Sequence, residues 1–105
     1  MNLWLEIKKL EGQTLRTLDR RKPFDVLSVT ERAVIVHPHA TRKERPIQRE
    51  GIENAYRRLT VTGKLTLNEI ENEFAPYNPV YVAAILAELS GITYSVRPIQ
   101  LRKSS

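Results

Sequence analysis

The two histidines of the chain, His37 and His39, lie on either side of Pro38. On an extended segment, side chains at positions i and i+2 point to the same side, as two ligands of one metal ion do. A metal site needs at least one more ligand, and the sequence assigns none, although Glu31 or Glu44 could approach in space. We therefore expect a solvent-exposed loop here, with no bound metal ion and no other cofactor.

The other catalytic patterns are incomplete. The only Glu-x-Lys triplet is Glu6 to Lys8, and no acidic residue precedes it, as a nuclease that uses this triplet requires. Ser28, Ser90 and Ser95 lie in no nucleophile-elbow motif, and the four glycines are too far apart to form a phosphate-binding loop. The sequence therefore predicts a protein that is not an enzyme.

Positive charge is concentrated in the first half of the chain. Residues 1–58 contain 13 Lys or Arg and 8 Asp or Glu, whereas residues 59–105 contain 4 of each. Such clusters are typical of a surface that binds polyanions, although any one of them alone is more commonly a solvated turn or helix face. The candidate nucleic-acid contacts are Arg20, Arg21, Lys22, Arg42, Lys43, Arg45, Arg57 and Arg58.

Residues 1–47 are predicted to form a helix and a β meander. Asn2 can cap a helix that ends at Gly12, with Trp4 as a core or lid residue. Alternating or apolar segments predict strands over residues 14–18, 24–29 and 33–36, and the last of these should be central because it is apolar on both faces. The segment Arg45 to Ile47 is expected to return as an edge strand, where Pro46 is tolerated.

Residues 48–97 are predicted to be mainly helical. The segment from Arg49 to Thr60 has an apolar stripe at helical spacing, and its spacing allows Glu53 to pair with Arg57 across one turn on the opposite side. Thr66 and Glu69 form a capping box, which predicts a second helix from Leu67 that ends before Pro76. A hydrophobic staple between Leu65 and Ile70 fits the same helix start.

A third helix is predicted over residues 78–90. Asn78 and Pro79 have the residue types of a helix cap and a first helical residue, and Gly91 suits a left-handed exit. The alternating residues 92–96 then predict a strand. The tail from residue 98 to residue 105 shows no periodicity, so we expect it to be flexible.

The predicted elements between Gly63 and Val96 are, in order, a short strand, a helix, a tight turn, a helix and a strand. This order resembles a winged helix-turn-helix domain. The resemblance covers about a third of the chain. Together with the chain length and the patterns described above, it predicts a single domain of the α+β class over residues 1–97. Its parts would be an N-terminal helix, a small antiparallel sheet of three to four strands, and a winged-helix-like tri-helical unit with a closing strand. The resemblance implies nucleic acid as the partner, with DNA ahead of RNA, although many winged-helix domains bind proteins.

The helix over residues 78–90 bears on the choice between these partners. Helical spacing turns Val82, Ile85, Leu86 and Leu89 toward the core, and the outer face then has no side chain of the kinds that read bases. A small apolar face of this kind fits a partner helix, either in a homodimer or on a larger protein. The residues predicted for this interface are Val80, Tyr81, Ala84 and Ala87.

Two functions therefore stay open. The first is a small basic nucleic-acid-binding protein, accessory or regulatory, that contacts phosphates through basic turns of its N-terminal half. The second is a regulatory or interaction subunit that docks through the outer face of the helix at 78–90. With no cysteine, no signal-peptide pattern and no apolar run long enough to span a membrane, the sequence predicts a cytoplasmic protein without a membrane partner.

Overall fold

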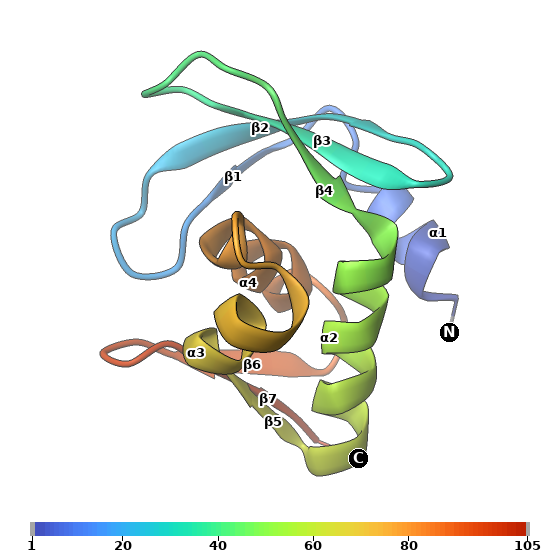
Figure 1. Cartoon of the computed structure of the whole chain (residues 1–105), viewed down its shortest axis with the longest axis vertical. Helices are drawn as coiled ribbons and strands as arrows, with labels where there is room; N and C mark the ends of the chain where they lie inside the picture. Colours follow the sequence, from blue (N-terminus) through green and yellow to red (C-terminus); the bar gives the residue numbers. More distant parts are fainter. Residues whose placement is uncertain (1, 105) are drawn as a thin grey trace.

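A computed structural model of the chain describes residues 2–104, which form two antiparallel sheets with helices between and beside them (Figure 1). The helices are α1 (Leu3–Lys8), α2 (Arg49–Thr62), α3 (Leu67–Glu69), the π-helical η1 (Ile70–Phe74) and α4 (Pro79–Ala87). The strands are β1 (Thr14–Arg16), β2 (Pro23–Val29), β3 (Ala33–Pro38), β4 (Arg45–Gln48), β5 (Lys64–Thr66), β6 (Ile92–Ser95) and β7 (Gln100–Lys103). The predicted α+β class is confirmed.

The first sheet is a meander with the strand order β1-β2-β3-β4. Strand β3 pairs with both β2 and β4, so its predicted central place is confirmed, and β4 with Pro46 is an edge strand as expected. Phe24, Val26 and Val29 of β2 are buried, with a β-bulge between Val26 and Ser28 that keeps Val29 on the core side. This face of the sheet packs on the helices below it (Figure 1).

Helix α1 closes one end of the first sheet. The Asn2 side chain accepts a hydrogen bond from the backbone N–H of Leu5, which confirms the predicted cap. Trp4 is half-buried, donates its indole N–H to the carbonyl of Thr30 at 2.7 Å, and has the Arg49 guanidinium 4.7 Å from its ring centroid. Its predicted role as a lid over the core agrees with these contacts.

Helix α2 connects the two sheets and packs on η1. Its side chains Ile52, Ala55 and Leu59 are buried, as the apolar stripe predicts. Gly51 allows a close approach, because a Cβ atom at this position would lie 2.6 Å from the carbonyl oxygen of Phe74. The longest helix within residues 2–104 has 14 residues, and no helix there has the length and apolar character needed to cross a bilayer.

The ion pair predicted on the outer side of α2 is wrong. Glu53 pairs with Arg49 at 3.3 Å, and Arg57 instead donates to the side-chain oxygen of Asn54 at 3.0 Å. Arg49 and Arg57 both lie one helical turn from Glu53, so sequence spacing does not distinguish between these two partners.

The start of the helical segment α3–η1 agrees with the prediction. The Thr66 hydroxyl accepts from the N–H of Glu69, the Glu69 carboxylate accepts from the N–H of Thr66, and Leu65 and Ile70 are both buried. The segment ends at Phe74, before Pro76. The local sequence therefore defines both ends of this segment.

The second sheet contains a strand that the sequence does not predict. Its order is β5-β7-β6, so β7 lies in the middle and pairs with both neighbours. Leu101 is fully buried. The expectation of a flexible tail from residue 98 is therefore wrong for residues 100–103, because β5 and β6 supply the hydrogen-bond partners for this short strand; Ser105 lies outside the described residues.

Helix α4 lies between the two sheets (Figure 1). Pro79 is its first residue as predicted, but the Asn78 side chain makes no capping hydrogen bond. Five consecutive residues, from Val82 to Leu86, are buried. The prediction that Ala84 faces outward is wrong, since only 2% of its surface is exposed: the first sheet covers one side of the helix and the second sheet covers the other.

Candidate nucleic-acid interface

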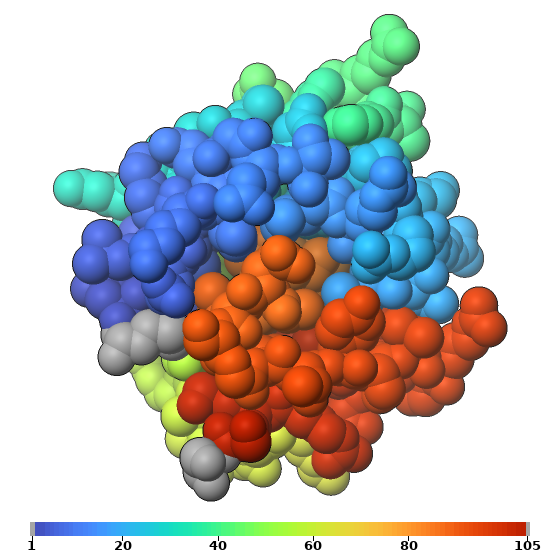
Figure 2. All heavy atoms as spheres, turned by 180° about the vertical axis from the view of Figure 1, so that it is seen from behind, coloured from blue at the N-terminus to red at the C-terminus, as the bar shows by residue number. Residues whose placement is uncertain are grey.

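Three strand connections project from the same edge of the molecule, to the left in Figure 1 and to the right in the reverse view of Figure 2. They join β1 to β2 (residues 17–22), β3 to β4 (residues 39–44) and β6 to β7 (residues 96–99). Together they hold six Arg or Lys residues and two acidic residues, hence a net charge of +4, whereas the whole chain has +5. We call this surface the turn edge, and its exposed basic residues are Arg20, Arg21, Lys22, Arg42, Lys43 and Arg97.

Each connection of the turn edge has one arginine with a left-handed backbone. The φ angles are +57° at Arg21, +55° at Arg42 and +61° at Arg97, and every other positive φ within residues 2–104 belongs to a glycine. A residue with a Cβ atom is less stable than glycine in this conformation. The chain therefore places a long cationic side chain at three positions where glycine would cost less backbone energy.

Local hydrogen bonds and one ion pair hold these connections together. Thr17 is buried, its N–H donates to the carbonyl of Lys22, and its hydroxyl accepts from the N–H of Lys22, both at 3.0 Å. Arg97 Nε lies 3.4 Å from Asp19 Oδ1, which links the β6–β7 connection to the β1–β2 connection. Among residues 2–104, this is the only ion pair that involves one of the six basic residues of the turn edge.

Three adjoining hollows of about 320, 390 and 360 Å³ run along the turn edge. The first and second share Lys22 and Tyr81, and the second and third share Asp19, Leu67 and Ile99, so the three hollows adjoin one another along this edge. Together we call them the turn-edge groove. Its apolar walls come from the first sheet, from α3 and α4, and from the β6–β7 connection, through Pro23, Pro38, Leu67, Val80, Tyr81 and Ile99.

Arg45 lies behind the groove and differs from the other predicted contacts in its burial. It is half-buried in β4, with its guanidinium carbon 6.0 Å from the ring centroid of Tyr81. The Tyr81 ring also contacts Phe24 edge to face, with the centroids 5.0 Å apart. Arg45 therefore fixes the Tyr81 ring together with Phe24, and it is less accessible to phosphates than the six residues of the turn edge.

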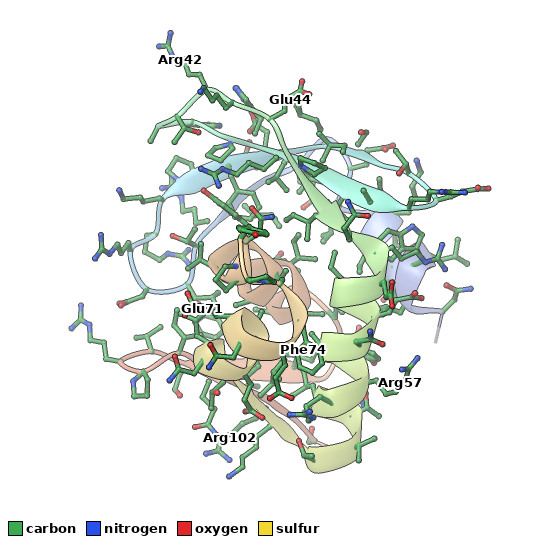
Figure 3. All side chains as sticks on the ribbon, viewed as in Figure 1. Arg42, Glu44, Arg57, Glu71, Phe74 and Arg102 are labelled. Atoms are coloured by element: carbon green, nitrogen blue, oxygen red, sulfur yellow. The ribbon has the colours of Figure 1, made fainter. Side chains whose placement is uncertain are left out.

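Arg57 and Arg58 lie away from the turn edge, as Figure 3 shows by the opposite positions of Arg42 and Arg57. Arg58 bonds Glu73 at 2.7 Å and Glu69 at 3.0 Å, and its guanidinium carbon is 5.2 Å from the Phe74 ring centroid. The hydrogen bonds that Arg58 donates to the Glu73 carboxylate raise the pKa of Arg58 and lower the pKa of Glu73. The pKa of Glu69 is also lowered, first by the backbone N–H of Thr66 and then by Arg58. The guanidinium of Arg58 is therefore engaged within the fold.

The predicted protein interface on α4 is divided by the fold. Val80 and Tyr81 are half-buried and border the turn-edge groove, Ala84 is buried, and Ala87 is half-buried against the core. These four residues therefore do not form one exposed helix face. A homodimer stays a prediction, but it would need another surface.

The two histidines lie beside Asp25 on the first sheet. His39 Nε2 is 2.9 Å from Asp25 Oδ1, and the Thr14 hydroxyl donates to the same oxygen at 2.6 Å. The bond from Thr14, followed by that from His39, lowers the pKa of Asp25. No group of three or more His, Cys, Asp or Glu within residues 2–104 is arranged to hold a metal ion.

Comparisons with known proteins return no match. No protein-family model fits the chain, and no curated protein and no solved structure is significantly similar to it. The interface is therefore judged on its own residues.

Sequence reasoning missed Arg97 and four wall residues of the groove, whereas Val80 and Tyr81 were predicted as an interface for a protein partner. Ile99 and Leu101 alternate with polar residues after Arg97-Pro98, which is the signal of a turn followed by a short strand. That signal could have placed Arg97 in a hairpin connection. Nothing in the sequence, by contrast, indicates that this hairpin lies beside the β1–β2 connection.

Proposed function

We propose that this protein binds nucleic acid through phosphate contacts at the turn edge. The observation that carries the proposal is a net charge of +4 on three connections that are distant in sequence and adjacent in the fold. Like charges that are gathered in this way repel each other, and they lower the stability of the unbound protein. A polyanion removes the repulsion and releases its own counterions, so the arrangement favours binding to phosphates.

The left-handed arginines support the same proposal. A left-handed residue helps to reverse the chain in a connection between antiparallel strands, and glycine would adopt this conformation at a lower cost. Arginine at all three positions therefore favours a role for the side chain, since residues in costly backbone conformations cluster at ligand-binding sites. Arg21, Arg42 and Arg97 each place a planar guanidinium at a different connection, where it can bind phosphate oxygens with two hydrogen bonds.

The proposed binding is tolerant of nucleotide sequence. Side chains that contact phosphates position a protein without reading bases, and the usual base-reading element of a helix-turn-helix protein is the second helix of the motif. Here α4, which follows the turn after η1, is buried between the two sheets. A buried helix has no access to the major groove.

We also propose that residues 49–103 are a variant of the winged-helix unit. The element order supports this: α2, β5, the segment α3–η1, α4, and then the hairpin β6–β7, which pairs with β5 through β7. In this interpretation the first sheet covers α4, and the connections of the turn edge take over the contact with nucleic acid.

The test compares two triple variants that lose the same charge. One replaces Arg21, Arg42 and Arg97 by Gln at the turn edge, and the control replaces Arg57, Lys64 and Arg102, which are exposed elsewhere, by Gln. Binding of labelled oligonucleotides is measured by fluorescence anisotropy over a range of salt concentrations. We expect the turn-edge variant to bind at least about tenfold more weakly and to lose roughly 0.7–0.9 of the log–log salt slope per lost contact.

The control should bind within about twofold of the wild type. Absence of wild-type binding at low salt would refute the proposal. Equal weakening in both triple variants would also refute it, because it would show a diffuse charge effect in place of a defined surface.

A further inference from the structure

We infer that the nucleic acid bound at the turn edge is single-stranded, with its bases in the turn-edge groove and its phosphates on the basic residues around the groove. This inference rests on the proposed function, and it names the form of nucleic acid that the surface accepts. The chemistry of the groove walls supports it.

The groove is basic at its rim and apolar within. Lys22, Arg20 and Arg97 border it, while Val80, Tyr81 and Leu67 form its walls. A single strand carries both complementary surfaces, because its phosphates are charged and the faces of its bases are apolar and unpaired. A duplex stacks its base faces inside and would leave the apolar walls in water.

Tyr81 is the residue best placed to contact a base. It borders both the hollow next to Ala40 and Thr41 and the larger hollow next to Thr17 and Arg20. Its contacts with Phe24 and Arg45 hold the ring in place before any ligand binds. A fixed aromatic ring in a basic groove is the usual platform on which bases of a single strand stack.

The charges around the groove favour a polyanion over an acidic or apolar protein segment. The two acidic residues of the turn edge are Asp19, which pairs with Arg97, and Glu44, which lies near Arg42 at the end of the β3–β4 connection. The remaining positive charge lies on three separate connections. A linear polyanion can follow this spacing from one connection to the next.

The test uses wild-type protein and four labelled ligands of equal length at one salt concentration: oligo-dT, oligo-rU, a duplex, and an abasic strand that keeps only the sugar-phosphate chain. We expect at least one of the two single strands to bind at least about tenfold more tightly than both the duplex and the abasic strand. The two single strands differ in the sugar and in the C5 methyl group of the base, and tight binding of either one supports the inference.

Variants of Tyr81 locate the contact. Tyr81→Leu keeps an apolar side chain and removes the ring, so single-strand affinity should fall about tenfold while duplex affinity stays the same. Tyr81→Phe keeps the ring and should bind within about twofold of the wild type. If Tyr81→Leu does not fold, the comparison between single strand and abasic strand with wild-type protein decides.

The outcomes separate this inference from the proposed function. If the duplex or the abasic strand binds as tightly as the single strands, the inference is wrong. The proposal of phosphate binding at the turn edge would still stand in that case. No change in single-strand binding for a folded Tyr81→Leu protein would overturn it as well. Failure of all four ligands to bind would refute the proposed function itself.

Discussion

Arg21 shows how a single residue connects backbone conformation with the proposed binding surface. Its φ of +57° costs about 1–2 kcal/mol for a residue with a side chain. Neighbouring groups offset part of this cost, because its N–H donates to the carbonyl of Thr17 at 3.1 Å and its carbonyl accepts from Arg16 Nη1 at 3.0 Å. The β1–β2 connection thus holds the guanidinium at the turn edge in spite of the backbone cost.

Replacing Arg21 by glycine should leave stability unchanged or raise it by up to about 1 kcal/mol. Glycine removes about 1–2 kcal/mol of left-handed strain, but it also gains about 0.4–1 kcal/mol of conformational entropy in the unfolded chain, which offsets part of that gain. Arg21→Val has a β-branched side chain, which tolerates the same φ less well than arginine does, and it should be less stable than the wild type. Chemical denaturation of both variants measures the difference. A glycine variant less stable than the valine variant would show that residue 21 does not have a left-handed backbone.

Helix α4 shows how an element can be apolar on all sides. Its nine residues, from Pro79 to Ala87, include no charged or amide side chain, and the sheets above and below it bury both faces. A helix that is hydrophobic all round belongs in a core. The assignment of Ala84 to an outer face relied on helical spacing, which carries no information when every position is apolar.

Ala84→Arg should therefore unfold the protein or destabilise it by at least about 3 kcal/mol, because a long charged side chain has no space and no partner at a buried position. Glu88→Arg, one turn further and exposed, should change the free energy of unfolding by less than about 0.5 kcal/mol. Thermal unfolding followed by circular dichroism checks both. An Ala84→Arg protein as stable as the wild type would place this residue on the surface.

The contact between α2 and η1 should make stability dependent on pH. The pKa values of Glu69 and Glu73 are lowered from 4.5 in the folded state, so the unfolded state binds more protons at acidic pH. Their stabilising contribution is present above about pH 4.5 and is lost as the pH falls through the folded pKa values. We expect the thermal midpoint to decrease from pH 5 to pH 3.

A matched pair of variants assigns this effect. Glu73→Gln should lower the thermal midpoint at pH 7, and the difference from the wild type should shrink toward pH 3, where the wild-type carboxyl is protonated. Glu71→Gln changes an exposed neighbour that makes no ion pair among the described residues, and it should follow the wild type at every pH. Identical pH curves for Glu73→Gln and the wild type would argue against the ion pair.

At the scale of the whole molecule, the last strand completes the fold. Strand β7 pairs with β5 on one side and β6 on the other, and Leu101 on this strand is fully buried. The second sheet supports α4, which in turn supports the first sheet through contacts such as Tyr81 with Phe24. The C-terminal residues are thus connected to every layer of the structure.

Deletion of residues 98–105 should abolish cooperative unfolding, because it removes the middle strand of the second sheet and exposes the core beneath it. Deletion of Ser104 and Ser105 alone, which follow β7, should leave the thermal midpoint within error of the wild type. Circular dichroism melts of the two truncated proteins give the answer. A folded 1–97 fragment would show that β7 is dispensable.

Features that depend on residues a few positions apart were predictable from the sequence. The Asn2 cap, the capping box between Thr66 and Glu69, the end of η1 before Pro76 and the edge position of Pro46 all follow from local hydrogen bonding and sterics. The basic clusters at residues 20–22 and 42–43 were equally visible, because charge is a property of composition.

Which of these parts lie together depends on tertiary packing. Strand β7 is stable because it pairs with β5, which is far away in the sequence, and its four residues carry no local sign of that partner. The burial of α4 likewise depends on a sheet formed by the other half of the chain. The turn edge and its groove follow from both events. The second sheet and the first sheet pack on opposite sides of α4, and this packing brings Arg97 of the β6–β7 connection beside Asp19 and places Tyr81 at the groove. Long-range packing of this kind depends on shape and pairing between distant segments, and local sequence patterns do not specify it.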